Sequence, residues 1–293
     1  HDVLPPGTRP GMLLTAMNAP NERTPSTPTG VIGVVHLPAL PGDPCADAQT
    51  TPQSVLDFAL RDADALATGG VDAIIVENFN SAPFYRGTAA DPAPAHQVAG
   101  LAVATQAVMA RVDVPVGVNC LRNDVRAALG IAAATGARFV RVNVHVGAYV
   151  TDQGVIEGEA SRTLAYRREL RVDDVAICAD VLVKHAAPLA PLAPEEAAHD
   201  CVDRDKADAV LVTGAATGAP VDAALLDAVG RGAGSAPVLI GSGLTPETAS
   251  DLAPRAHGAV VGTWLKRDGQ LRAPVDAERV KRLCDAVQGR FRS

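Results

Sequence analysis

Hydrophobic and polar positions follow one repeating pattern from Val31 onward. Short runs of β-branched and aliphatic residues alternate with longer Ala-rich segments, and Gly, Pro, Asn or Asp residues separate them. The short runs predict eight strands, at Val31–His36, Asp72–Asn78, Val116–Leu121, Phe139–Val146, Val175–Lys184, Ala209–Thr213, Val238–Gly241 and Ala259–Thr263. The longer segments predict eight helices, near Pro52–Thr68, His96–Arg111, Asp124–Thr135, Ser161–Leu170, Pro194–Asp203, Asp222–Gly230, Pro246–Ala253 and Asp276–Val287.

Eight consecutive βα units of similar length favour a single (β/α)8 TIM barrel, with a doubly wound sheet as the rival architecture. Composition agrees, because 47% of the residues are hydrophobic but only 3% are aromatic, as expected for parallel strands covered by Ala-rich helices. The barrel domain is assigned to residues 31–293. Residues 1–30 are rich in Pro, Thr and Asn without a lasting apolar period, and predict a flexible N-terminal tail.

Charge and cysteine content narrow the class of partner. A net charge of -7 argues against a nucleic-acid polymer, because no basic run is available to neutralise phosphates. No apolar stretch approaches the roughly 20 residues of a membrane span, which predicts no membrane insertion. The five cysteines are scattered and form no C-x-x-C pair, so they indicate a reduced, cytoplasmic protein rather than a zinc ribbon or a disulfide framework.

Polar side chains gather where the predicted strands end, which is where a barrel carries its active site. Strand four is the clearest case, because alternation places Arg141, Asn143 and His145 on one face and four valines on the other. The candidate catalytic residues from this reasoning are His36, Glu77, Asn119, Arg141, Asn143, His145, Asp180 and Lys184.

Each candidate also has a structural interpretation, because buried polar groups must satisfy one another or a ligand. Arg141 on strand four can pair with Asp180 on strand five, and Lys184 can act only as a counter-charge. Desolvation of Lys184 beside Arg141 would lower its pKa and make it a candidate base or Schiff-base amine.

Histidine titrates in the range that acid–base catalysis needs, so His36 and His145 are candidate proton carriers as well as candidate structural groups. Glu77 is the natural carboxylate partner, as a general base or as a metal ligand.

Glycines after the last strands indicate an anion site. Gly241, Ser242 and Gly243 follow strand seven, and Gly262 and Thr263 follow strand eight, where many barrels bind a substrate phosphate. Thr213, Thr217 and Gly218 at the end of strand six join the candidate binding residues. The segment Gly147–Gly158 after strand four predicts a loop, of which Thr151–Gly158 is expected to close over a substrate. Lys266 is a further candidate charge for the anion site, although it is expected on the surface.

Several long stretches resemble the BtpA/SgcQ family. They are Val31–Gly42, Gly69–Phe79, Gly117–Asp124, Phe139–Gly154 and Ala179–Ala186, together with the Gly-Ser-Gly and Val-Gly-Thr segments. The resemblance covers nearly everything after Gly30 and implies a barrel related to the ribulose-phosphate-binding group. It also adds Arg122, Asn123 and Asp152 as candidate substrate-binding residues, with His185 as a further motif position. One family name comes from photosystem I accumulation and another from a sugar-utilisation gene cluster, so the resemblance implies no particular reaction.

Three classes of function follow. The leading hypothesis is an enzyme that acts on a phosphorylated sugar or a nucleotide-like molecule by acid–base chemistry, as an isomerase, a lyase or aldolase, or a glycosidic-bond hydrolase. The second is a metal-assisted enzyme of the same barrel group, with a divalent metal as cofactor and with His36, Glu77, His145 and Asp180 as ligands. The third is a non-enzymatic assembly or biogenesis factor. The expected partner is a small phosphorylated molecule, and a homo-oligomer is compatible with the sequence.

Overall fold

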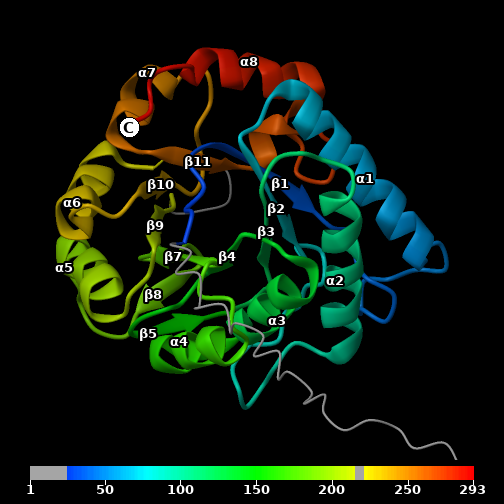
Figure 1. Cartoon of the computed structure of the whole chain (residues 1–293), viewed down its shortest axis with the longest axis horizontal. Coiled ribbons are helices and arrows are strands. Elements are labelled where there is room, and N and C mark those ends of the chain that lie inside the picture. Colours follow the sequence, from blue (N-terminus) through cyan, green and yellow to red (C-terminus); the bar gives the residue numbers. More distant parts are fainter. Residues whose placement is uncertain (1–24, 215–220) are drawn as a thin grey trace, which may run out of the picture.

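The alternating pattern of the chain forms a closed barrel of parallel strands (Figure 1) in the computed structural model, which describes residues 25–214 and 221–293. Around the barrel the order is β1, β11, β10, β9, β7, β4, β3 and β2. The strands are β1 (Gly30–His36), β2 (Ala73–Glu77), β3 (Val116–Asn119), β4 (Phe139–Val142), β7 (Ala176–Val181), β9 (Ala209–Val212), β10 (Val238–Ile240) and β11 (Gly258–Val261). The (β/α)8 barrel is therefore confirmed, and the doubly wound sheet is wrong.

Helices cover the outside of the barrel on all sides (Figure 1). The α-helices are α1 (Pro52–Gly69), α2 (Ala95–Met109), α3 (Val125–Thr135), α4 (Ala160–Glu169), α5 (Pro194–His199), α6 (Ala223–Ala233), α7 (Ala249–Leu252) and α8 (Ala277–Val287). A π-helical turn, η1 (Asp200–Arg204), extends α5, and short 3-10 turns follow as η2 (Ala253–Arg255), η3 (Thr263–Leu265) and η4 (Arg267–Gly269). Within the described ranges, no helix combines the length and apolar character needed to cross a bilayer.

Aliphatic side chains fill the barrel interior around one aromatic ring. Phe139 on β4 is buried there with Ile32, Ile75 and Leu211 among its cluster. Gly117 on the neighbouring β3 makes room for it, because a Cβ at that position would stand 2.3 Å from the Phe139 ring. Interiors are close-packed, so the floor of the barrel is a solid core rather than a channel.

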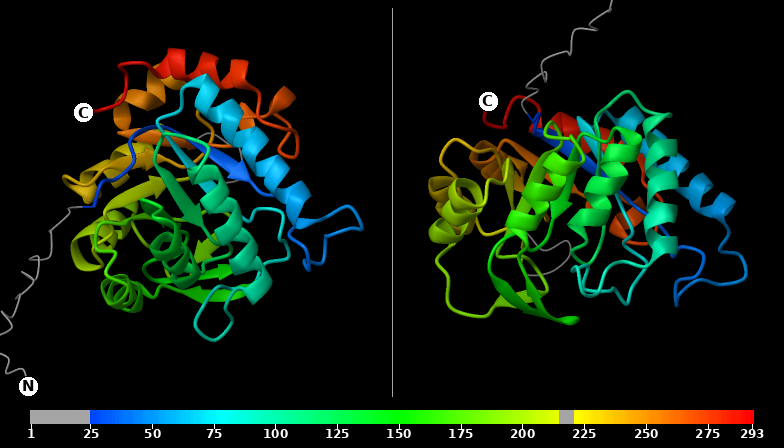
Figure 2. Two further views of the ribbon diagram at one scale, coloured as in Figure 1. Left: turned by 45° about the vertical axis from the view of Figure 1, so that its right-hand side comes forward. Right: turned by 60° about the horizontal axis from the view of Figure 1, so that its bottom comes forward.

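A small antiparallel sheet stands above the ends of β4 and β7, where the sequence predicted a loop. It consists of β5 (Ala148–Thr151), β6 (Gly154–Glu157) and β8 (Ala186–Pro188). In the right-hand view of Figure 2 the hairpin of β5 and β6 (green) extends at the lower edge of the molecule. Tyr149 and Ile156 pack with Val144 and Val183 beneath it. The predicted loop is therefore built as a β-hairpin with its own strand pairing and core.

The fourth strand is shorter than its alternating pattern predicts, ending at Val142 rather than Val146. The reason is the Asn123 side chain, which donates from Nδ2 to the Val144 carbonyl at 2.9 Å and accepts from its N–H at 2.7 Å. Both backbone groups of Val144 are thereby satisfied outside the barrel ladder. The fifth predicted strand likewise ends at Val181 rather than Lys184.

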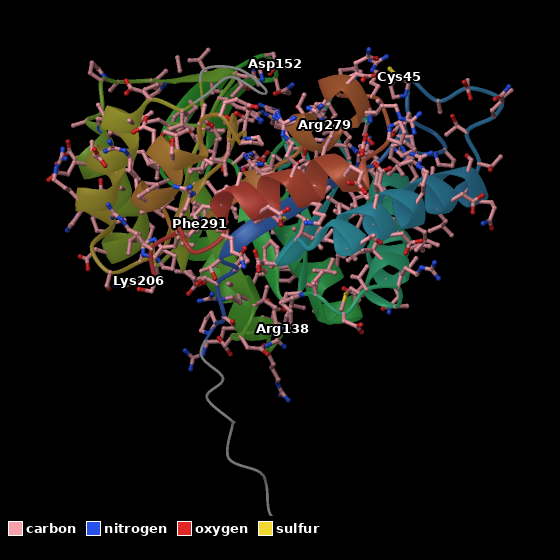
Figure 3. The ribbon with its side chains drawn as sticks, turned by 90° about the horizontal axis from the view of Figure 1, so that it is seen from above. Cys45, Arg138, Asp152, Lys206, Arg279 and Phe291 are labelled. Atoms are coloured by element: carbon pink, nitrogen blue, oxygen red, sulfur yellow. The ribbon has the colours of Figure 1, made fainter. Side chains whose placement is uncertain are left out.

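The two ends of the barrel are distinct (Figure 3). Arg138 and Lys206, which precede β4 and β9, lie at one end, and Asp152 and Cys45 lie at the other. The latter is the end at which the strands finish, and it carries the polar residues described next.

Candidate functional site

Three neighbouring strands bring a histidine, a carboxylate and an amide side by side at the carboxyl end of the barrel. The strand register pairs His36 with Glu77 and Glu77 with Asn119. The Asn119 Nδ2 donates to Glu77 Oε2 at 2.6 Å, and His36 Nε2 lies 3.8 Å from Glu77 Oε1. All three side chains are buried. One oxygen of Glu77 is therefore held in place while the other faces the imidazole.

A buried ion pair joins the next two strands. The Arg141 guanidinium donates from Nε and Nη2 to the two oxygens of Asp180, at 3.0 and 2.9 Å. Asn143 Nδ2 adds a third hydrogen bond to Asp180 at 3.1 Å, and Arg141 Nη1 lies 3.9 Å from Glu77 Oε2. Burial opposes the charge of Arg141, but Asp180 and then Glu77 outweigh burial and raise its pKa. Asp180 is thus fully occupied in fixing Arg141, as the structural interpretation predicted.

Lys184 lies in the segment between β7 and β8 and reaches the same space. Its backbone N–H donates to Thr213 Oγ1 at 3.1 Å, and its carbonyl accepts from Arg122 Nη2 at 2.9 Å. Its amine has no hydrogen bond or ion pair with any residue that the structure describes. Burial and then the nearby Arg141 charge lower the Lys184 pKa, although Glu77 and Asp180 oppose them. A desolvated lysine without a fixed partner is the form that acts as a base or a nucleophile.

His36 is held neutral by its surroundings. Burial is the largest cause of a pKa well below its usual value, and the charges of Lys266, Lys184 and Arg141 lower it further. Its Nδ1 is buried with no hydrogen-bond partner among the described residues. The ring leans on Phe79, with 4.6 Å between the ring centroids. The imidazole is therefore uncharged at neutral pH and has a nitrogen free of described partners.

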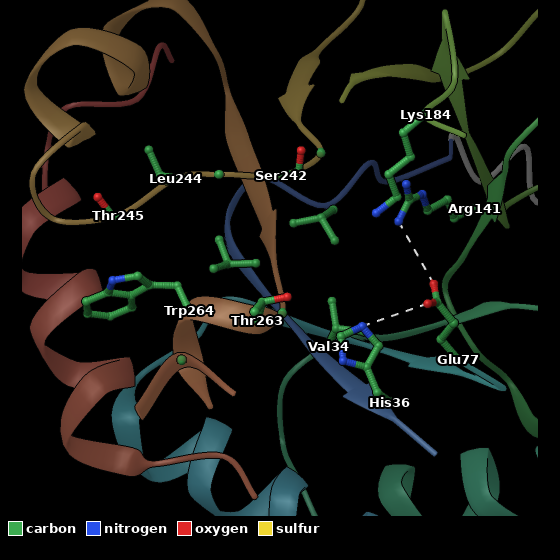
Figure 4. A pocket seen from close by; sticks show the side chains of 16 residues that line it. Val34, His36, Glu77, Arg141, Lys184, Ser242, Leu244, Thr245, Thr263 and Trp264 are labelled. Atoms are coloured by element: carbon green, nitrogen blue, oxygen red, sulfur yellow. Dashed lines mark ion pairs between the residues drawn. The ribbon is translucent and has the colours of Figure 1, made fainter. Parts of the chain in front are cut away.

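A cavity of about 160 Å³ opens beside this group (Figure 4). We call it the glycine cavity. It is lined by His36, Glu77, Arg141, Lys184, Gly241, Ser242, Gly243, Leu244, Thr245, Gly262, Thr263, Trp264 and Gly269, with Val34, Val260 and Val261 at its base. Figure 4 shows the charged side chains on one side and the loops that follow β10 and β11 on the other.

Backbone groups of those two loops are available for an anion. Ser242 Oγ accepts from the Gly214 N–H at 2.8 Å, which fixes the loop after β10. The N–H groups of Gly243 and Thr263 donate to no acceptor in the described parts of the chain. Trp264 closes the outer wall, and the Arg279 guanidinium stacks on it, 4.4 Å from the ring centroid. The predicted glycine-rich residues therefore do border the cavity that holds His36.

A second cavity, of about 280 Å³, adjoins the first across Glu77, Arg141 and Lys184. We call it the arginine cavity. Its other lining residues are Phe79, Phe84, Asn119, Leu121, Arg122, Asn143, Asp152 and His185. It thus contains Arg122 and Asp152 from the set of predicted binding residues.

Six predicted site residues line neither cavity or are not placed. Asp180 and Thr213 are two of them, and they hold Arg141 and the Lys184 N–H as described above. His145 is buried with its Nε2 2.9 Å from the Asp205 carbonyl, so it leaves the row that alternation predicted and lines neither cavity. The Asn123 side-chain amide forms both of its hydrogen bonds with the Val144 backbone, as described above. Thr217 and Gly218 lie outside the described residues.

Lys266 is the clearest error of expectation. It is fully buried rather than on the surface, with its Nζ 2.6 Å from Asp62 Oδ2, and both side chains have an exposed fraction of 0%. It stands 5.8 Å from the centre of the Phe58 ring. Burial lowers the pKa of Lys266 while Asp62 opposes that effect. Sequence reasoning also missed Trp264. It is the one Trp of the chain, and that fact could have drawn attention to it.

The proposed metal ligands do not converge. In the ranges the structure describes, no three His, Cys, Asp or Glu side chains are grouped so as to hold a metal ion. Asp180 is bound by Arg141, and His145 by the Asp205 carbonyl. The residues therefore do not fit the metal-assisted alternative.

Comparison with known sequences gives one consistent family. The model of the BtpA family matches residues 27–289. A photosystem I biogenesis protein, BtpA, of Synechocystis sp. is 44% identical over 88% of this chain and 87% of its own length. An uncharacterized protein of Thermococcus kodakarensis is 43% identical over 88% of this chain and 95% of its own length.

Comparison with solved structures gives the same fold at low identity. A tryptophan synthase structure from M. tuberculosis matches with a TM-score of 0.54 and 19% identity, over 89% of this chain and 94% of the other. Thiamine phosphate pyrophosphorylase from Pyrococcus furiosus matches with a TM-score of 0.53 and 14% identity, over 89% and 96%. These likenesses concern the barrel fold.

Proposed function

The chain belongs to the BtpA family, and we propose that it is an enzyme that acts on a phosphorylated sugar or a nucleotide-like molecule by acid–base chemistry. One observation carries the proposal. The glycine cavity has a neutral His36 and the carboxylate Glu77 at one side and the glycine-rich loops after β10 and β11 at the other.

The phosphate of the substrate is assigned to those loops. Gly243 and Thr263 offer backbone N–H groups, and barrels commonly bind phosphate after their last two strands. The name of one solved structure of similar fold, thiamine phosphate pyrophosphorylase, also refers to a phosphorylated compound. We assign the sugar to the space between these loops and the charged side chains that line the same cavity.

Proton transfer is assigned to His36, with Glu77 orienting its Nε2. A neutral imidazole accepts a proton from a substrate carbon or hydroxyl, and the resulting imidazolium gains the nearby carboxylate as counter-charge. Arg141 and Lys184 face the same space and stabilise negative charge that develops on the substrate. Isomerisation, retro-aldol cleavage and glycosidic-bond cleavage all use these groups, and the proposal includes all three.

A ligand screen tests the proposal. The change in Tm is measured with a panel of sugar phosphates and nucleotides, each beside its unphosphorylated counterpart. A ligand that binds only the native state raises the apparent stability by about 2.7 kcal/mol at a hundred times its Kd. We expect phosphorylated members to raise Tm and their counterparts to have no effect. If no phosphorylated compound shifts Tm, the proposed function is wrong.

Lys184 separates the aldol route from the others. Borohydride reduction in the presence of substrate traps a Schiff base on its amine, and the adduct is read by peptide mass. Sustained turnover by the Lys184→Ala variant would exclude that route and leave His36 and Glu77 as the working groups.

An assembly role is the second candidate, because the Synechocystis relative carries the name of a biogenesis protein. Such a role requires an outer surface and does not require the buried polar end of the barrel. Replacing His36 and Lys184 together distinguishes the two, because an assembly factor would keep its partner function when these side chains of the cavity are removed.

A further inference from the structure

We propose that a third cavity, which shares His36 with the glycine cavity, binds a planar heteroaromatic ring. The substrate would then be a sugar phosphate that carries such a ring. The inference rests on the proposed function, because it assigns ring and phosphate to one molecule. This phenylalanine pocket has a volume of about 460 Å³. Its main lining residues are His36, Pro38, Phe58, Phe79, Phe84 and Leu271.

Phenylalanine is scarce in this chain, and most of it is in this pocket. The 293 residues include five Phe, of which Phe58, Phe79 and Phe84 line the pocket. All three are half-buried rather than part of the core, and they come from α1 and from the segment between β2 and α2. Three partly exposed aromatic rings around one cavity are typical of a ligand site, because without a ligand their apolar surface is exposed to water.

The phenylalanine pocket adjoins the proposed catalytic groups. His36 lines both the glycine cavity and the phenylalanine pocket, and its ring contacts that of Phe79. Phe79 and Phe84 also line the arginine cavity beside Glu77. A single ligand can therefore place its phosphate at the glycine loops, its sugar along His36 and Glu77, and its ring among the phenylalanines.

Polar groups at the edge of the pocket indicate the kind of ring. Arg272 is exposed at the rim and forms no ion pair with a described residue. Asn80 donates from Nδ2 to the Leu37 carbonyl at 2.7 Å, which leaves its Oδ1 to accept from a ligand. These groups suit the N–H and carbonyl edge of a nucleobase-like ring, whereas an alkyl chain would form no hydrogen bond with either.

Cys45 provides a reporter inside the pocket. It is exposed and lines the cavity, whereas the other four cysteines are buried or half-buried. Burial raises the thiol pKa of those four, which are Cys120, Cys178, Cys201 and Cys284. Alkylation of the folded protein with iodoacetamide is therefore expected at Cys45, and a ligand in the pocket slows it.

The experiment compares ribose 5-phosphate with the adenosine, guanosine, cytidine and uridine 5′-monophosphates, using affinity and the rate of Cys45 alkylation. We expect at least one nucleotide to bind about tenfold or more tightly than ribose 5-phosphate, from the stacking of its base. We expect the same nucleotide to slow alkylation, and ribose 5-phosphate to leave the alkylation rate unchanged.

Two variants complete the test. Phe58 lines the phenylalanine pocket and neither of the other two cavities, so Phe58→Leu should remove most of the nucleotide advantage and preserve ribose 5-phosphate binding. Phe291→Leu, a half-buried phenylalanine outside the three cavities, should change neither. If ribose 5-phosphate binds as tightly as every nucleotide and none protects Cys45, the ring site is wrong and the proposed function stands. If no phosphorylated compound binds, both are wrong.

Discussion

Arg141 and Asp180 face each other through two parallel hydrogen bonds inside the barrel, and the pair sets the geometry of the candidate site. Asn143 takes a further hydrogen bond to the same carboxylate. Because the guanidinium is fixed in this way, its free edge points to Glu77, 3.9 Å away. The ion pair thus orients the charge that the proposed reaction uses, rather than moving protons itself.

Asp180→Ala should strongly destabilise the fold. It leaves the buried Arg141 charge without its main partner, and breaking one side of a buried pair typically costs about 3–5 kcal/mol of unfolding free energy. Urea unfolding measures the change. The matched control is Asp64→Ala, which breaks the exposed pair of Asp64 with Arg111 and should have little effect. Equal losses in the two variants would contradict this account.

The Lys184 amine should react at lower pH than an ordinary lysine. The chain has four lysines, and the surface Lys281 is a direct comparison, because its hydrogen bond to Asp285 raises its pKa while burial and Arg141 lower that of Lys184. Acetylation of each lysine is followed by peptide mass across a pH series. The reagent is small and is applied as a short pulse, and each lysine is compared with its own maximal rate so that accessibility cancels. The pH of half-maximal rate should be lower for Lys184 than for Lys281. A higher value for Lys184 would show that its amine is paired.

The alternation of short apolar runs and Ala-rich segments was sufficient to predict the barrel, because each βα unit buries its own hydrophobic face locally. The same rule failed where a side chain from elsewhere replaced the strand ladder. Asn123 binds the Val144 backbone, so β4 ends early and His145 turns toward the Asp205 carbonyl. Alternation along one strand contains no information on such a contact.

Pairings between distant segments account for the rest of the difference. Arg141 and Asp180 were predictable because they lie on adjacent parallel strands, with Asp180 two residues beyond Cys178, the register partner of Arg141. Lys266 and Asp62 are 204 residues apart, and a lysine in a polar loop segment carries no local sign of burial. The phenylalanine pocket was likewise hidden, because Phe58 belongs to the amphipathic pattern of α1 and meets Phe79 and Phe84 only in the folded barrel.

The buried Lys266 pair offers a test of its own. Asp62→Leu leaves the Lys266 ammonium fully buried with no described partner, and should cost about 3–5 kcal/mol of unfolding free energy. The double variant Asp62→Leu with Lys266→Met removes both charges and should recover most of that stability. Denaturant unfolding of the three proteins decides it. A double variant as unstable as the single one would mean that lost packing, rather than the unpaired charge, is the cause.

Stability should fall as the solution becomes acidic, partly through His36. Its folded-state pKa lies well below 6.5, so above about pH 6.5 both folded and unfolded chains have it neutral and it contributes nothing. As the pH falls below that value, the unfolded chain binds a proton that the folded chain refuses, and the free energy of unfolding decreases. One such proton corresponds to at most about 1.4 kcal/mol per pH unit.

The His36→Asn variant should reduce this slope between pH 6.5 and the onset of acid unfolding. It should not abolish it, since burial also lowers the pKa of His145 and His257. Urea unfolding at a series of pH values gives both slopes. An unchanged slope in the variant would show that His36 takes up its proton in the folded state as readily as in the unfolded one.

Gly262→Ala should displace His36, the proposed proton acceptor, without replacing its imidazole. A Cβ at Gly262 would stand 2.5 Å from His36 Cε1 and 3.1 Å from Nε2, so the imidazole must move away from the glycine cavity. Small displacements of a catalytic group cost about a hundredfold in rate, and sugar phosphate binding at the same loop should weaken by about tenfold.

The control is Gly130→Ala on α3, where the added Cβ meets only Tyr166 Oη at 3.8 Å. Ligand affinity and the NMR signal of the His36 ring are measured in both variants, with circular dichroism to confirm folding. Only Gly262→Ala should lose ligand affinity, and its His36 signal should shift. Wild-type affinity in that variant would contradict the assignment of the phosphate to this loop.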